Sequence, residues 1–310
     1  MSKENKKQVQ SASTPPGGFR VIAREFMKDR LALTSLIILV TVLLAVFIGA
    51  LLLNQEQVMK VNLLGRYLEP GVDSYILGTD EGGKDIFGQL IIGARNSIII
   101  GFTITIITSI VGISVGLISG YYGGRLDGFL MRIVDFIMIL PVTMLIIVFV
   151  TVIKNYTIYH FILIMSAFYW TAKARLFRTR TLSEASLDYV NASKTLGTSD
   201  FMIMFREILP NLSSLIIVNL TLNFAGNIGI ETSLTYLGFG LPSTVPSLGT
   251  LIANARNADI LENKTWIWLP AAIFILVMML CINYVGQAFQ RAADAKQRLA
   301  FLRKGFFFHG

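Results

Sequence analysis

Residues 189–211 read YVNASKTLGTSDFMIMFREILPN and close a polar connection, residues 173–210, that separates two apolar segments. Within it, Gly197 is suited to stop one short helix, and Ser199 and Asp200 offer capping oxygens for a second helix that Pro210 would end. Connections inside compact domains are usually shorter than this one. The stretch therefore predicts a helical hairpin, which is either a docking surface for another protein or an amphipathic element lying on a membrane surface.

The composition around this hairpin is that of an integral membrane protein. The chain has 310 residues, of which 54% are hydrophobic and 15% charged, and its mean hydropathy is +0.63. A helix needs about 20 apolar residues to cross a hydrocarbon core of about 30 Å. We therefore predict an all-α polytopic membrane protein with six transmembrane helices, which begin near Leu31, Ser97, Phe129, Tyr156, Leu212 and Trp266.

The positive charges predict how the chain is oriented. Cytoplasmic flanks collect Lys and Arg, and most of the 27 such residues lie in the N-terminal arm, the 173–210 connection and the C-terminal tail. Both termini and the connection are therefore expected in the cytoplasm, and the net charge of +8 needs no nucleic-acid partner. The predicted organisation is an arm at 1–30, a first helix at 31–53, an external loop at 54–96, a five-helix core at 97–287 with the connection at 173–210 and an external loop at 231–264, and a tail at 288–310.

Several kinds of chemistry are disfavoured by the residues present. Cys281 is the single cysteine and there are two histidines, so a disulfide within the chain and a Cys or His metal site are not expected. Residues 78–84, GTDEGGK, match the start of a phosphate-binding loop, but Asp85 replaces the required Ser or Thr and the neighbouring acidic side chains would repel phosphate. The apolar run at 31–53 is too long for a signal-peptide core and is expected to remain as an anchor, with a cleaved signal as the alternative. We predict no catalytic residue, metal or cofactor in this chain.

Two spacings inside the apolar segments predict helix contacts. Gly112, Gly116 and Gly120 recur every four residues, which allows a second helix to approach closely. Arg132 and Asp135 lie three residues apart in the third segment, so they can meet on one helix face. That pair is predicted to be either a structural ion pair or a gating contact.

A helix breaker and a polar stripe mark the third and fifth apolar segments. Pro141 is expected to kink the third segment. Asn219, Asn223, Asn227 and Glu231 follow one another at four-residue intervals on the fifth. Because such groups avoid lipid, the stripe is predicted to face either a translocation path or a partner subunit.

The hairpin resembles the EAA loop of permease subunits of binding-protein-dependent ABC importers. The pattern of that loop is EAA, three residues, Gly, nine residues and then I-x-LP, and NAS at 191–193, Gly197 and LP at 209–210 fall at the matching spacings. This chain departs from the pattern with Asn and Ser in the first motif and with Glu207 in place of Ile. The Gly and Pro positions, which shape the backbone, are kept.

Two other stretches are similar to the C-type permeases of the peptide/nickel group, closest to oligopeptide permease C subunits. LGTDEGGKDIFGQLIIGARNSIIIG at 77–101 resembles their external signature LGTDxxGRDxxSRxxxGARxSL, with Lys84 in place of Arg. ETSLTYLGFGLPSTVPSLGTLI at 231–252 resembles their segment EASLSFLGLGxxxPxPSWGxML, with Leu248 in place of Trp. The resemblance covers roughly residues 19–300.

The resemblance implies a division of labour in a bacterial cell membrane. A homologous second permease would complete the path for oligopeptides, two cytoplasmic ATPases would bind ATP and Mg, and an extracytoplasmic peptide-binding protein would deliver the substrate. Alternatives are a permease for dipeptides, glutathione or nickel and, from another class, a stand-alone secondary transporter with repeated halves and buried ionisable residues. By resemblance, the residues that contact an ATPase would be Tyr189, Asn191, Ala192, Ser193, Lys194, Leu196, Gly197 and Pro210.

Overall fold

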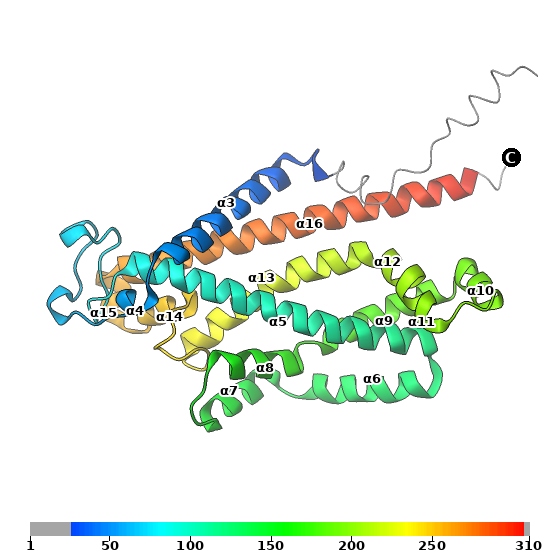
Figure 1. The fold of residues 1–310 in the computed structure, drawn as a ribbon, viewed down its shortest axis with the longest axis horizontal. Helices are drawn as coiled ribbons and strands as arrows, with labels where there is room; N and C mark the ends of the chain where they lie inside the picture. The colour runs from blue at the N-terminus through cyan, green and yellow to red at the C-terminus, as the bar shows by residue number, and fades with distance from the viewer. Residues whose placement is uncertain (1–25, 307–310) are drawn as a thin grey trace, which may run out of the picture.

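The computed structural model describes residues 26–306, and it describes side chains as far as residue 292. Within this range the protein is an elongated bundle of helices, and an isolated bridge between Thr79 and Asp85 is its one β pairing (Figure 1). The all-α prediction is confirmed for these residues. The predicted arm before residue 26 and the last four residues of the predicted tail lie outside them.

Four long helices run along the bundle: α3 (Arg30–Leu52), α5 (Ile86–Tyr122), α13 (Ser213–Leu237) and α16 (Leu269–Phe306) (Figure 1). Among the described residues these four are long and apolar enough to cross a membrane, and a bent helix pair adds a fifth candidate. The fourth apolar segment forms α8 (Ile158–Phe168), whose 11 residues span about 16 Å and are too short to cross alone. Four or five spans are thus supported by helix length, against the six predicted.

Helix α5 begins earlier than the sequence predicted, and the expected external loop at 54–96 is correspondingly shorter. Asp85 is the reason, because its carboxylate accepts hydrogen bonds from the backbone N–H groups of Phe87 (3.1 Å) and Gly88 (2.9 Å) and so caps the helix. The 37 residues of α5 are about 55 Å long, which exceeds the membrane core. The helix therefore projects beyond it.

The polar connection expected at 173–210 begins with a helix of the bundle. This helix, α9 (Thr171–Ala185), packs along α5, and Lys173 is 3% exposed and donates from Nζ to Thr108 Oγ1. A Cβ placed on Gly116 would lie 2.6 Å from the carbonyl oxygen of Ala174. The close helix contact predicted from the glycine spacing is confirmed. The helix that contacts these glycines is α9, which lies in the connection predicted from the sequence. The prediction missed this helix because its many polar residues obscure the spacing of its buried side chains.

The third apolar segment is broken in two. Helices α6 (Gly124–Ile139) and α7 (Val142–Val152) meet at 74°, with Leu140 and Pro141 between them. Proline lacks an N–H and clashes with the preceding helical turn, and it pushes the residue before it to extended backbone, as the ψ of 139° at Leu140 shows. The predicted kink is confirmed, and it amounts to a complete break in the helix.

The two ends of the bundle carry different elements (Figure 1). One end gathers the segments between α3 and α5 and between α13 and α16. The other end carries the hairpin. The shorter elements are α4 (Gln55–Val58), η1 (Leu63–Gly65), η2 (Val72–Ser74), α14 (Leu248–Ala253), η4 (Asn254–Arg256), α15 (Ala258–Asn263) and η5 (Thr265–Ile267) at the first end, and α10 (Asp188–Thr195), α11 (Asp200–Ile203), η3 (Met204–Ile208) and α12 (Leu209–Asn211) at the second.

Candidate functional site

The hairpin turns where the sequence predicted. Helix α10 ends at Thr195, and Gly197, directly after the cap residue Leu196, has a φ of +81°, a left-handed conformation that glycine adopts without strain. The N–H of Gly197 donates to the carbonyl of Lys194 (3.0 Å) and that of Thr198 donates to the carbonyl of Ser193 (3.1 Å). These two bonds form a Schellman motif, which satisfies the last carbonyls of a helix. The predicted stop at Gly197 is confirmed.

The second arm of the hairpin does not end at Pro210, so that prediction is wrong. The chain stays helical through α11, η3 and α12 and enters α13 after Leu212. Element η3 is a π-helical turn in which the N–H of Leu209 bonds to the carbonyl of Met204. This wider turn lies directly before Pro210 and gives room to a residue that would clash with a regular helical turn.

The inner side of the hairpin is anchored to the bundle by apolar packing. Val190 of α10 and Ile203 and Ile208 of the second arm are fully buried in one cluster with Leu117 of α5 and Phe177 of α9. Fully burying such side chains contributes about 1.5–3 kcal/mol each. The hairpin is therefore continuous with the core of the α5–α9 pair.

Polar contacts tie the two arms to each other and to α5. Ser193 Oγ donates to Glu207 Oε1 (2.7 Å), and Tyr121 of α5 donates its hydroxyl to Asp200 Oδ1 (2.7 Å). Lys194 Nζ lies 4.5 Å from the centre of the Tyr121 ring, a cation–π contact. Ser193 and Glu207 both depart from the EAA pattern, and they bond to each other. The two departures from the pattern are therefore in direct contact with each other.

This bond predicts coupled effects on stability. Ser193→Ala removes a donor from Glu207, and Glu207→Ile removes the acceptor from Ser193, so each single change should lower stability by about 1 kcal/mol. The double variant, which restores two positions of the family pattern, should lose about 0.5–1 kcal/mol less than the sum of the single changes. Thermal melting of the purified protein in detergent measures the cycle. Strict additivity would contradict the coupling.

Tyr189 connects the two ends of the hairpin through hydrogen bonds. Its hydroxyl donates to Glu184 Oε1 (2.8 Å) and accepts from Asn211 Nδ2 (3.0 Å), so it joins α9 to α12. Burial, with a smaller contribution from the hydrogen bond to Glu184, raises the pKa of Tyr189 to about 12. The phenol therefore stays protonated and keeps donating at physiological pH.

The outer side of the hairpin exposes large apolar side chains. Leu196 is 85% and Phe201 67% exposed, and the rings of Phe201 and Phe205 lie 4.5 Å apart. Exposed apolar groups gathered on one element mark an interaction surface. Of the residues predicted to contact an ATPase, Ser193 is half-buried, whereas the remaining seven are exposed: Tyr189, Asn191, Ala192, Lys194, Leu196, Gly197 and Pro210.

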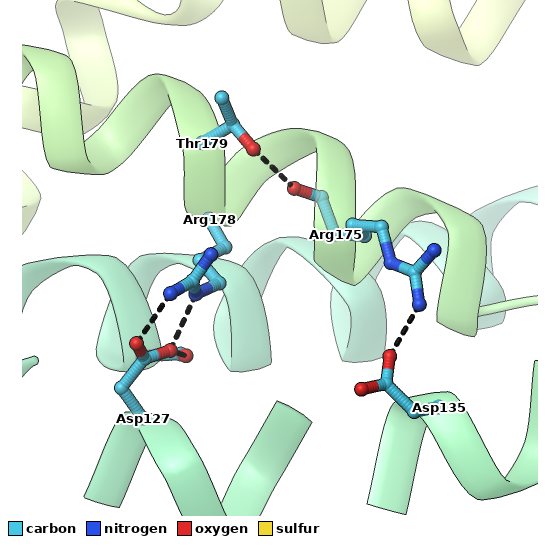
Figure 2. Close-up of polar contacts among 6 residues, drawn as sticks. Asp127, Asp135, Arg175, Arg178 and Thr179 are labelled. Carbon is cyan, nitrogen blue, oxygen red and sulfur yellow. Dashed lines mark hydrogen bonds and ion pairs between the residues drawn. The ribbon is translucent and has the colours of Figure 1, made fainter. Parts of the chain in front are cut away.

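Two ion pairs join α9 to α6 (Figure 2). Arg178 forms two hydrogen bonds with the carboxylate of Asp127, and Arg175 pairs with Asp135. The predicted partner of Asp135 was Arg132, and that assignment is wrong. Neighbouring α9 presents a guanidinium to Asp135 across the helix interface, an arrangement that spacing along α6 cannot reveal.

The polar stripe of α13 faces the bundle interior over the C-terminal half of the helix. Asn227 Nδ2 donates to Thr105 Oγ1 (2.8 Å), and Glu231, which is fully buried, accepts from Ser97 Oγ (2.9 Å). Both contacts are to α5. These two residues fasten α13 to α5, so neither predicted surrounding, a path or a partner subunit, is supported for them.

The remaining stripe residues are half-buried. Asn223 Nδ2 donates to the carbonyl of Asn219 within α13 (2.8 Å), and Asn219 Oδ1 is buried without a partner among the described residues. Positions four apart rotate by about 40° around a helix at each step, so the stripe drifts across the surface of α13. Its two halves therefore face different surroundings.

The two further motifs at 77–101 and 231–252, far apart in sequence, meet in the structure. Asn96 Nδ2 donates to the carbonyl oxygen of Pro246 (2.8 Å), and a Cβ on Gly93 would lie 2.9 Å from the carbonyl carbon of Ser247. Gly93 thus allows the turn before α14 to rest on α5. The sequence contained both motifs but no signal that they touch.

The loop at 78–84 is closed by its own acidic residue. Asp80 Oδ1 accepts from the backbone N–H groups of Gly82 (2.8 Å) and Lys84 (3.0 Å). Backbone N–H groups are what a phosphate-binding loop offers its ligand. With these two already bonded to a carboxylate, the geometry agrees with the exclusion made from sequence.

Several helices long enough to cross a membrane, one bent helix pair and a hairpin anchored to the bundle define a helical membrane protein. Residues 112–299 match the family described as binding-protein-dependent transport system inner membrane component, and the chain belongs to this family. The resemblance identified from sequence is confirmed.

Its relatives carry specific names. The chain is 51% identical over 276 residues to the oligopeptide transport system permease protein OppC of Lactococcus lactis subsp. lactis, covering 89% of this chain and 94% of that protein. It is 32% identical to the protein of the same name from Mycobacterium bovis, covering 92% of this chain and 96% of the relative. It is 31% identical to the dipeptide transport system permease protein DppC of Bacillus subtilis, covering 96% and 92%.

Proposed function

We propose that this chain is a permease subunit of an ATP-driven importer and forms, with a homologous second permease, the path for oligopeptides that an external binding protein delivers. The names of its relatives support this substrate class, and the identity to the oligopeptide permease of Lactococcus lactis exceeds that to the dipeptide permease. Dipeptides are therefore the second candidate, followed by glutathione or nickel.

We also propose that the chain crosses the bilayer six times with both termini in the cytoplasm. In this topology α8 and the start of α9 together form the fourth crossing.

The exposed hairpin is the observation that carries this proposal. Its outer side offers Leu196, Phe201 and Phe205 to a partner, and its inner side is packed into the α5–α9 core. A partner that moves the hairpin would move that helix pair with it. We assign the outer side to one of two cytoplasmic ATPases, which would hold ATP and Mg and perform the hydrolysis.

Co-purification with Gly197→Asp tests the proposal. Gly197 is exposed and a Cβ there would meet nothing within 4 Å, although its φ of +81° strains most side chains. Asp is one of the residues that tolerate a left-handed backbone best, so the variant should fold with a modest loss of stability while placing a charge in the docking surface. From native membranes in mild detergent, mass spectrometry should find a second permease and two ATPases with the unaltered chain. The variant should retain the second permease, lose the ATPases and lose peptide import.

Gly197→Asn is the matched control, because Asn also tolerates a left-handed backbone but brings no charge. It should keep the ATPases. Recovery of the chain alone in several mild detergents would instead favour a stand-alone secondary transporter. ATPases retained by Gly197→Asp and also by Leu196→Asp would leave the hairpin as a membrane-surface element.

A further inference from the structure

A hollow of about 530 Å³ lies on α13 on the side of Gly226 and Ser233. It is bounded by α7, by Tyr169 between α8 and α9, and by α16, and it is open on one side. Its volume is within the range of small-molecule sites. Besides aliphatic side chains, its lining consists of glycines and hydroxyl-bearing residues: Thr143, Tyr169, Gly226, Gly229, Thr232 and Ser233.

Its glycines have no packing role, unlike those of α5. A Cβ on Gly226 would meet nothing within 4 Å, and one on Gly229 would meet only the flexible end of Met279, at 3.1 Å. Glycine inside a helix costs about 1 kcal/mol relative to alanine. Because close helix contact does not explain these two glycines, what they provide is open space along the helix.

Hydroxyl groups line the hollow beside the glycines. Ser233 is exposed, and its Oγ donates to the carbonyl oxygen of Gly229 (2.8 Å) within α13, which leaves the oxygen able to accept. Thr143 and Tyr169 add two further hydroxyls to the same hollow. The hollow is therefore largely apolar with a few hydroxyl groups to which water or a polar solute can bond, as is usual for binding cavities.

The break in the third span points to the same place. Helix α7 starts after Pro141 without a side-chain cap, so the N–H groups of its first turn have no partner within the helix. Thr143, on that turn, lines the hollow. Inside a membrane, non-helical backbone is tolerated where protein buries it or where it borders a water-filled cavity.

We propose that this hollow is the wall that this chain contributes to the translocation path, and that an extended peptide passes along the Gly226–Ser233 face of α13. The inference rests on the proposed function and identifies the surface of this chain along which the peptide would move. Hydroxyls both donate and accept, so they can serve the N–H and C=O groups that every peptide carries. Glycines leave room for side chains of any size. The open side of the hollow is where the second permease completes the path.

Thiol accessibility in the assembled importer tests this inference. Because Cys281 is the single cysteine, Cys281→Ala gives a cysteine-free parent. Into it we would place Ser233→Cys and Thr143→Cys on opposite walls of the hollow and, as the control, Leu44→Cys, at a position on α3 that is 56% exposed on the apolar surface. Each importer, reconstituted in liposomes, is treated with a membrane-impermeant methanethiosulfonate.

Cysteines in the hollow should react about 50-fold faster than the one at Leu44, because the reactive thiolate forms in water and is penalised in lipid. Modification at position 233 should also abolish import of a radiolabelled peptide mixture, while treated Leu44→Cys still imports. If the parent imports peptides but neither wall cysteine reacts, or if both cross-link to a helix of the second permease, the path inference is wrong. If the parent imports no peptide although assembled, the proposed function itself fails.

Discussion

Gly116→Ala is expected to destabilise the protein strongly, although it adds a single methyl group. The new Cβ would lie 2.6 Å from the carbonyl oxygen of Ala174 and 2.8 Å from the backbone nitrogen of Arg178. Both atoms belong to the backbone of α9, so relief requires the whole helix to move. Overpacking of this kind costs about 1–3 kcal/mol. The variant should melt at a lower temperature in detergent, and less of it should elute as a monodisperse species.

Gly128→Ala is the matched control for this prediction. Gly128 lies on α6, and a Cβ there would meet nothing within 4 Å. Because alanine favours helix over glycine by about 1 kcal/mol, this variant should be as stable as the unaltered protein or more stable. Equal melting temperatures for the two alanine variants would show that the α5–α9 contact is looser than the structure has it.

Asp127→Asn should have the second large effect, because it removes the charge that partners Arg178. The Asp127 side chain is 13% exposed and that of Arg178 29%, and Ser119 also donates to this carboxylate. Removing one partner of a fully buried pair costs about 3–5 kcal/mol, and the partial exposure here should reduce the loss to about 2 kcal/mol. Thermal melting measures the loss of stability. Peptide import should fall as well, because α6 would lose the more buried of the two ion pairs that join it to α9.

The neighbouring ion pair supplies the control. Asp135 and Arg175 are 53% and 50% exposed, so Asp135→Asn should cost no more than about 1 kcal/mol. Reversing the buried pair with Asp127→Arg and Arg178→Asp together should recover part of the stability that Asp127→Asn loses. If both asparagine variants behave alike, burial does not set the strength of the Asp127 pair.

The hairpin shows how far sequence reasoning reaches. Local chemistry fixed the turn at Gly197, since a left-handed residue and its two backbone bonds involve only nearby atoms. The end assigned at Pro210 failed because a proline stops a regular helix but is accommodated after a π turn. The residues of a turn determine the backbone conformation close to them, so the sequence predicts it. A π turn depends on how the segment packs against other helices, so the sequence does not predict it.

The sequence did not predict which helices contact each other. The glycine spacing on α5 predicted a close neighbour but not that the neighbour is α9, whose polar composition resembles a loop. Asp135 was assigned to the nearest cation along its own helix, while the closest cation in space lies on α9. The stripe from Asn219 to Glu231 was expected to face a translocation path or a partner subunit, and its C-terminal half is bonded to α5.

The sequence by itself determined the class of this protein: a helical membrane protein, its family and its hairpin. These follow from hydropathy, from motif spacing and from the backbone preferences of Gly and Pro, which act over a few residues. The tertiary structure alone decided which polar groups are shared between α5, α9 and α13 and which face of α13 remains open. The physical reason is that burial and hydrogen bonding depend on distances between helices. A periodic sequence predicts which face of a helix is polar, but it does not predict which element packs against that face.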